Sequence, residues 1–206
     1  MSIRPDSEET REQAARVIAS GGLIAFRTDT FYGLGADPRK TAAVKRIRTI
    51  KGRDDGKPIL LLIGDLAEVK SLVASEPPLF RVITNHLWPG PLTVVVPASE
   101  TLPHEVTAGS GSIGLRLPDN DDLRELLMSC GGVLTATSAN PSGSEPATSA
   151  LQVAEYFPSG IDLIIDAGVV TATSPSTVVD VTCDPPRIIR EGAVARAELE
   201  SLSIFV

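Results

Sequence analysis

Two short groups of polar residues in this sequence could carry chemistry. Lys51 and Arg53 stand two residues apart beside a glycine, and Ser138 and Asn140 have the same spacing within the small, hydroxyl-rich segment 135–143. A lysine acts as a point charge and an arginine as a bidentate fork, so the first pair suits a polyphosphate. Each group also has an ordinary interpretation: a K-x-R pair on a solvated surface, and a cap and turn that begin the next helix.

The distribution of charge favours a local anion site near the first pair. Between residues 39 and 57, eight basic residues stand against two acidic ones, whereas the whole chain has a net charge of −7. Some of these cations, such as Lys40, Lys45 and Arg46, are expected on the solvated face of a helix. The acidic balance of the whole chain disfavours broad nucleic-acid binding.

Several other chemistries find no support in the sequence. Neither G-x-G-x-x-G nor G-x-x-x-x-G-K-[ST] occurs, so neither a Rossmann nor a Walker nucleotide site is indicated. No G-x-S-x-G motif is present, and His86 and His104 are expected on a helix surface and in a loop. Cys130 and Cys183 lie far apart without metal-ligand spacing, which predicts a reduced, cytoplasmic protein without a Cys/His zinc site or other protein-bound metal.

The overall composition predicts one domain, residues 1–206, with a full hydrophobic core. The chain is 42% apolar with a mean hydropathy of +0.12, and only 4% aromatic, so its core must consist mainly of Val, Ile, Leu and Ala. The first nine residues are polar and acidic, unlike a signal peptide, and no apolar run is long enough to cross a bilayer. We therefore expect a protein that is neither exported nor membrane-bound.

The elements that must position the polar groups are strands and helices that mingle without strict alternation. The apolar pattern predicts helices over 8–20, 41–50, 66–73, 78–87, 121–128 and 149–156, and strands over 23–26, 59–63, 92–96, 112–117, 133–136, 163–165, 177–181 and 187–190. The continuous apolar run 59–63 is typical of a strand buried on both faces. The pattern predicts an α+β (mixed α/β) fold with a twisted mixed sheet flanked by helices, not a doubly wound parallel sheet.

Polar motifs follow several of these elements, and together they suggest that the motifs surround the opening of a single site. Read in order, seven blocks resemble the YrdC-like family of L-threonylcarbamoyladenylate synthases. The blocks are residues 28–35, 51–53 with 57–58, 88–93, 114–118, 138–143, 176–180 and 190–192. The resemblance extends from about Gly21 to Gly192 and implies a YrdC/RibB-like sheet with a positively charged central cavity. The chain resembles the short, single-domain form of the family.

The resemblance also implies a reaction in which L-threonine, bicarbonate and ATP form threonylcarbamoyl-AMP and pyrophosphate. The implied catalytic residues are Lys51, Arg53, Ser138 and Asn140; the ATP-binding residues are these four with Ser112 and Arg190; and the threonine-binding residues are Thr28, Arg116, the backbone near Ala136, and Ser176. Lys51 and Arg53 would neutralise the phosphates as a carboxylate oxygen attacks the α-phosphorus. Ser138 and Asn140 would orient the nucleotide, and Arg116 suits the carboxylate of threonine.

The implied cofactor is Mg²⁺, which would arrive with ATP and be held by phosphates and water. The implied partners are tRNA-modification proteins that accept the product and modify the adenosine beside the anticodon. This sequence departs from the family pattern at Arg27, where proline is usual, at 59–63, where many relatives carry a histidine, and at Pro146, where a nucleotide-contacting serine is common. We expect Arg27 to point outward.

Two alternatives remain open. One is a non-catalytic RNA-binding or ribosome-assembly module that binds RNA weakly through the basic segment 39–57. The other is a related adenylating or carbamoyl-transfer enzyme with a different acceptor.

Overall fold

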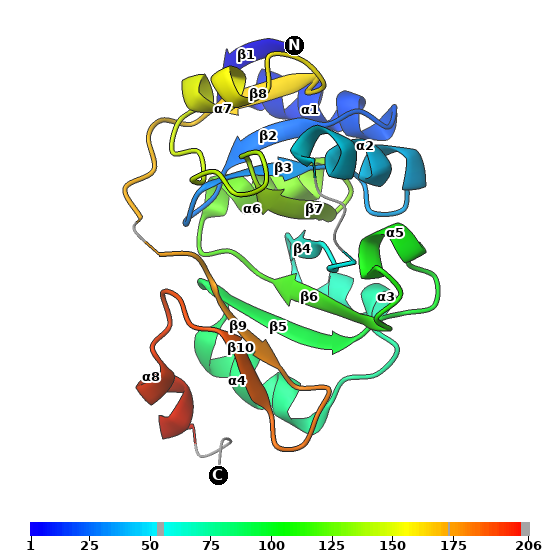
Figure 1. Ribbon diagram of the computed structural model, residues 1–206, viewed down its shortest axis with the longest axis vertical. Coiled ribbons are helices and arrows are strands. Elements are labelled where there is room, and N and C mark those ends of the chain that lie inside the picture. Colours follow the sequence, from blue (N-terminus) through cyan, green and yellow to red (C-terminus); the bar gives the residue numbers. More distant parts are fainter. Residues whose placement is uncertain (53–55, 173, 203–206) are drawn as a thin grey trace.

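The computed structural model describes residues 1–52, 56–172 and 174–202, and within them ten strands form one mixed sheet (Figure 1). The strand order is β1 (Ser2–Pro5), β8 (Leu163–Asp166), β2 (Ile24–Arg27), β3 (Tyr32–Gly35), β7 (Val133–Ser138), β4 (Leu60–Ile63), β6 (Ser112–Arg116), β5 (Leu92–Pro97), β9 (Thr177–Asp180) and β10 (Arg187–Arg190). Four neighbouring pairs are parallel, β1–β8, β2–β8, β4–β6 and β5–β9, and the others are antiparallel. The predicted mixed sheet is confirmed.

Helices cover both faces of this sheet. They are α1 (Glu8–Ala19), α2 (Thr41–Lys51), a 3₁₀ turn η1 (Leu66–Glu68) that leads into α3 (Val69–Leu72), α4 (Pro78–Leu87), α5 (His104–Thr107), α6 (Asp121–Ser129), α7 (Ala150–Tyr156) and α8 (Arg196–Ser201). None of the helices in the part of the chain that the structure describes is long and apolar enough to cross a membrane.

The core consists of three hydrophobic clusters separated by the sheet. Leu61 and Ile63 of β4 pack into one cluster with α2 and α4, whereas Leu62 packs into another with α1 and α6. Because successive side chains of a strand point to opposite faces, β4 is buried on both sides, as its apolar run predicts. The core is built mainly from aliphatic side chains, with Phe80 and Trp88 in edge-to-face contact.

The helix that carries Lys51 ends where a glycine can reverse the chain. Gly52 follows α2 and adopts the left-handed conformation, with φ +61°. In this conformation its N–H donates to carbonyls of the last helical turn. The apolar residues Val44 and Ile47 hold the helix against the core. The side chain of Lys51 is therefore buried at the end of β7 instead of pointing into solvent.

The prediction of elements was wrong or incomplete at several short segments. The strands β1 and β3 and the helices α5 and α8 were missed, and residues 66–73 divide into η1 and α3 rather than forming one helix. His104 begins α5 and does not lie in a loop. The two glycines of β3 hide its strand character, yet Gly35 is required there, because a Cβ would lie 2.5 Å from the Phe26 ring.

Candidate active site

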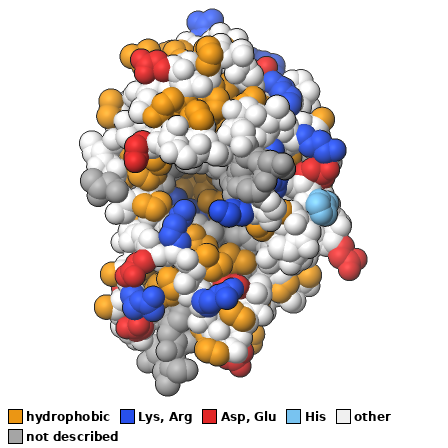
Figure 2. All heavy atoms as spheres, viewed as in Figure 1, with side chains coloured by type: hydrophobic (Ala, Val, Ile, Leu, Met, Phe, Trp, Pro, Cys, Tyr) orange, Lys and Arg blue, Asp and Glu red, His pale blue; other side chains and the backbone are white. Residues whose placement is uncertain are grey.

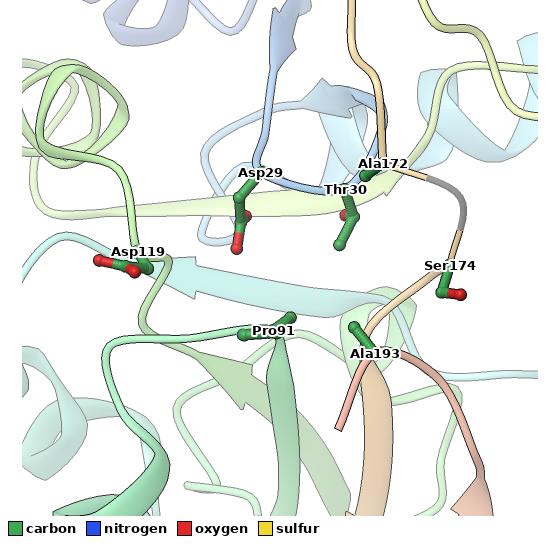
Figure 3. A pocket seen from close by; sticks show the side chains of 7 residues that line it. All are labelled: Asp29, Thr30, Pro91, Asp119, Ala172, Ser174 and Ala193. Carbon is green, nitrogen blue, oxygen red and sulfur yellow. The ribbon is translucent and has the colours of Figure 1, made fainter. Parts of the chain in front are cut away.

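A cavity of about 440 Å³ opens on the concave side of the curved sheet. Its lining comes from five separate segments, contributing Asp29, Thr30, Pro91, Asp119, Ala172, Ser174 and Ala193 (Figure 3). The surface view shows a hollow between the upper and lower halves of the molecule, with lysine and arginine side chains at its lower rim (Figure 2). None of the predicted site residues that the structure describes lines this cavity itself, although Asp29 and Thr30 lie directly after Thr28 and Ser174 lies two residues before Ser176.

The sheet must curve strongly to enclose this cavity. Asp29, in the turn between β2 and β3, forms an ion pair with Arg116 of β6. In the strand order, β3, β7 and β4 lie between β2 and β6. Side chains from both halves of the sheet can therefore act on one ligand.

Arg116 is the central cation of the site, and its side chain is only 3% exposed. Its Nε donates to the carbonyl of Gly90 at 3.0 Å, its Nη1 donates to the hydroxyl of Thr30 at 3.3 Å, and its Nη2 contacts Asp29. Burial lowers the pKa of Arg116, Asp29 raises it, and the nearby charge of Arg190 lowers it. Arg116 is buried whereas Arg190 is exposed, and their like charges favour an anion beside them.

Thr28 organises the turn that presents Asp29 and Thr30. Its hydroxyl accepts the N–H groups of Thr30 and Phe31, both at 3.1 Å, and donates to the carbonyl of Phe31 at 2.7 Å. The same hydroxyl lies 3.0 Å from that of Thr30. Thr28 and Arg116, both predicted to bind threonine, are therefore joined through one hydrogen-bonded turn.

Ser176 and Arg190 form a second polar group at the lower rim. Arg190 Nη2 donates to the Ser176 carbonyl at 2.8 Å and contacts its hydroxyl at 3.2 Å. The Ser176 hydroxyl also lies 3.0 Å from that of Thr93 on β5. Partial desolvation lowers the pKa of Arg190, but this residue is exposed, unlike Arg116.

Lys51 joins the two motifs that first suggested chemistry. Its Nζ donates to the carbonyls of Asn140, at 2.7 Å, and Ser138, and its own carbonyl accepts the N–H of Ser142 at 2.9 Å. Lys51 is 4% exposed. The structure therefore brings Lys51, Ser138 and Asn140 together; Arg53 lies outside the described residues.

The segment around Ser138 and Asn140 does not cap a helix. The next helix, α7, begins at Ala150 and is capped by Ser149, so the ordinary interpretation of this motif is wrong. Asn140 Nδ2 instead donates to the carbonyls of Pro141, at 3.0 Å, and Ser144, at 2.7 Å. These bonds fix a turn beside Lys51 and leave Asn140 Oδ1 buried without a hydrogen-bond partner.

The remaining predicted positions lie along β6 and β7. Ser112 begins β6, so it lies at the opposite end of that strand from Arg116, and its hydroxyl is 3.1 Å from that of Ser110. Ala136 pairs with Leu60 and is 7% exposed, two residues before Ser138. Ser112 is thus separated from the group around Arg116.

Buried polar atoms without hydrogen bonds concentrate on the motif residues. Among the described residues there are five such side-chain atoms, and four of them belong to Arg27, Asp29, Arg116 and Asn140. Most buried polar atoms are hydrogen-bonded, so a cluster of exceptions marks a place where a ligand can complete the bonding. Arg27 lies on the strand face of Ala25 and donates to the Ala167 carbonyl at 3.4 Å.

The two carboxylates of the cavity, Asp29 and Asp119, were not predicted as site residues. An aspartate in a turn after a strand is ordinary, so only the contact between Asp29 and Arg116 distinguishes it. The described residues contain no group of three or more His, Cys, Asp or Glu side chains that could hold a metal ion.

Comparison with known proteins agrees with these motifs. The model of the Sua5/YciO/YrdC family, described as "Telomere recombination", matches residues 16–192. The chain belongs to the Sua5/YciO/YrdC family. A threonylcarbamoyl-AMP synthase from Pyrococcus abyssi is 36% identical over 203 residues, which cover 98% of this chain and 60% of that protein. One from Thiobacillus denitrificans is 36% identical over 180 residues, which cover 87% of this chain and 95% of that protein.

Solved structures of the Sua5/YciO/YrdC family share the fold. The P. abyssi Sua5 structure complexed with L-threonine matches with a TM-score of 0.92 at 36% identity, covering 97% of this chain and 59% of that one. The E. coli YciO structure matches with a TM-score of 0.82 at 30% identity, covering 93% of this chain and 94% of that one. This chain therefore spans about 60% of the length of its Pyrococcus relative but nearly all of shorter members.

Proposed function

We propose that this protein is a nucleotidyltransferase that converts L-threonine, bicarbonate and ATP into threonylcarbamoyl-AMP and pyrophosphate. The observation that carries the proposal is the buried Arg116, which contacts the cavity residues Asp29 and Thr30 and lies near the charge of Arg190. Proteins named threonylcarbamoyl-AMP synthase are similar to this chain over most of its length. A related Sua5 structure is complexed with L-threonine.

The carboxylate of threonine would bind at Arg116. A guanidinium matches a carboxylate with two parallel hydrogen bonds, and a buried one gains more from the match than an exposed one. Thr28, Ser176 and the backbone near Ala136 would complete this part of the site. The amino group, as the free amine, would combine with bicarbonate to form a carbamate and water, and a carbamate oxygen would then attack the α-phosphorus of ATP and release pyrophosphate.

The nucleotide would bind along Lys51, Ser138 and Asn140, with Arg53, Ser112 and Arg190. The ammonium group of Lys51 is already held by the carbonyls of Ser138 and Asn140. Phosphate oxygens would therefore contact a preorganised cation and not a flexible side chain. Asn140 Oδ1, buried and without a hydrogen bond, could accept a donor group of the ligand. Lys51 and Arg53 would neutralise the charge that builds on the phosphates during attack on the α-phosphorus.

Mg²⁺ would enter with ATP as part of the substrate. Mg²⁺ prefers oxygen ligands and keeps several waters, so it would be coordinated mainly by phosphate oxygens and water. The product would pass to proteins that modify tRNA in the cytoplasm.

The contacts of the basic segment count against the RNA-binding alternative. Lys45 pairs with Glu105 at 3.2 Å, Arg46 pairs with Asp162 at 3.1 Å, and Arg48 donates to backbone carbonyls. These cations hold α2 to neighbouring loops and are not arrayed for a phosphate backbone. The side chains of Lys45 and Arg46 are 63% and 43% exposed, so they lie on the solvated face of α2 as predicted, and each is paired with a nearby carboxylate.

The test is pyrophosphate release measured with purified protein and each combination of threonine, bicarbonate and Mg-ATP. We expect turnover only with all three, with threonylcarbamoyl-AMP detected by mass spectrometry. Lys51→Ala should lower the rate by about 100-fold or more, whereas Lys70→Ala, on the exposed side of α3, should not change it. ATP turnover indifferent to threonine would refute the proposal, and product formed with serine or carbamoyl phosphate instead would favour the carbamoyl-transfer alternative.

A further inference from the structure

Asp29 occupies an unusual position in the cavity, because it already neutralises the arginine that a substrate carboxylate would need. Its Oδ2 is in ion-pair contact with Arg116 Nη2, and its side chain is 16% exposed and lines the cavity. Its Oδ1 is buried and has no hydrogen-bond partner. Figure 3 shows the Asp29 side chain pointing into the cavity, whereas that of Asp119 points away from it.

We propose that Asp29 recognises the amino group of the substrate: it yields Arg116 to the incoming carboxylate and binds the ammonium group itself. This inference rests on the proposed function and names the residue that makes the site selective for an α-amino acid.

The hydrogen-bonding state of Arg116 supports this exchange. Nε and Nη1 donate to neutral oxygens, of Gly90 and Thr30, and these bonds orient the guanidinium plane. Nη2 forms the ion pair with Asp29 Oδ2, whereas Asp29 Oδ1 is buried and makes no hydrogen bond. A cation and a carboxylate with an unused acceptor therefore lie side by side, and an α-amino acid carries the complementary carboxylate and ammonium on one carbon atom.

The charge balance of the site favours a zwitterion over a simple acid. Arg116 and Asp29 together are neutral, so an α-amino acid adds no net charge when each end binds its opposite. A carboxylic acid without the amine would displace Asp29 and leave that carboxylate buried without a cation, which is strongly unfavourable. Rejecting the wrong ligand through an unpaired buried charge is a general route to specificity.

The experiment compares two ligands that differ only in the amine, L-threonine and (R)-3-hydroxybutyrate, by isothermal titration calorimetry. The proteins are the wild type, Asp29→Asn, and the control Asp119→Asn, which changes a cavity carboxylate that makes no contact with Arg116 among the described ion pairs. We expect the wild type to prefer threonine strongly. Asp29→Asn should weaken threonine binding by about 30-fold or more and leave binding of the hydroxy acid unchanged or tighter; Asp119→Asn should preserve the preference.

Other results would overturn the inference. If Asp29→Asn weakens the binding of both ligands equally, Asp29 only positions Arg116. If both ligands bind more tightly to Asp29→Asn, Asp29 only competes with the ligand carboxylate for Arg116. If Asp29→Asn proves unfolded by circular dichroism, the wild type alone decides, since equal affinity for the two ligands would exclude recognition of the amine. A wild type that binds no threonine would refute the proposed function itself and this inference with it.

Discussion

Replacing Thr177 by valine should destabilise the protein although the side chain keeps its shape. The hydroxyl is fully buried, donates to the Val194 carbonyl at 2.7 Å, and accepts the N–H groups of Gly192 at 2.9 Å and Val194 at 3.0 Å. Val194 is 5% exposed, so its N–H and carbonyl cannot turn to water. With about 1–3 kcal/mol for each buried group left unpaired, we expect a loss of about 3 kcal/mol in the free energy of unfolding.

Thr84→Val is a matched control for this prediction. Thr84 lies in α4 and is 3% exposed, but its hydroxyl makes no hydrogen bond. Removing a buried hydroxyl that has no partner should leave stability unchanged or raise it by about 1 kcal/mol.

Urea titration followed by far-ultraviolet circular dichroism measures both variants. For a chain of this size, the loss in Thr177→Val corresponds to a fall of about 6–12 °C in the melting temperature. If the two variants unfold within about 0.5 kcal/mol of each other, below the net worth of one hydrogen bond, the reasoning from hydrogen-bond partners is wrong.

Three further results are expected. Burial raises the pKa of the Cys130 thiol to about 12, so iodoacetamide at pH 8 should label the exposed Cys183 and spare Cys130 by mass spectrometry; equal labelling would contradict the burial. Gly192→Ala should reduce ATP turnover, because a Cβ at this position would lie 2.3 Å from the carbonyl oxygen of Pro175. Gly56→Ala should not reduce it, because a Cβ there would meet no atom within 4 Å. Burial raises the pKa of Tyr32 from 10 to about 12. The contribution of Tyr32 to stability should therefore be complete below pH 10 and be lost as the pH approaches 12. If the difference in the free energy of unfolding between the wild type and Tyr32→Phe stays constant across this range, the prediction is wrong.

The sequence predicted the parts of the fold in which local pattern and final environment agree. The apolar run at 59–63 could only be a strand buried on both faces, and β4 is one. The segment 32–35 was not predicted as a strand, because glycine has low strand propensity, and Gly35 is needed there for close packing against Phe26. The four-residue helix α5 is too short to show a helical period.

In the candidate site, too, the features that show in local sequence could be predicted, whereas those that depend on long-range contacts could not. The K-x-R and S-x-N motifs could be found from residue types and spacing, and the contact of Lys51 with the carbonyls of Ser138 and Asn140 joins them. The pairing of Asp29 with Arg116 could not be found in this way, because it depends on the curvature of a sheet with three strands between them. A contact made by long-range topology leaves no local trace in the sequence.

The positions of Arg116 and Arg190 explain how an acidic chain can attract anionic substrates. The cations of the segment 39–57 that the structure describes are largely engaged with nearby carboxylates and carbonyls, so they contribute little attraction at a distance. Desolvation lowers the pKa of Arg116, which is buried, and of Arg190, which is exposed at the surface. An anion that enters the cavity restores the missing stabilisation in a medium of low dielectric, where each contact is stronger than at the surface. Affinity for the substrate should therefore depend on these two residues and much less on the number of basic residues in the chain.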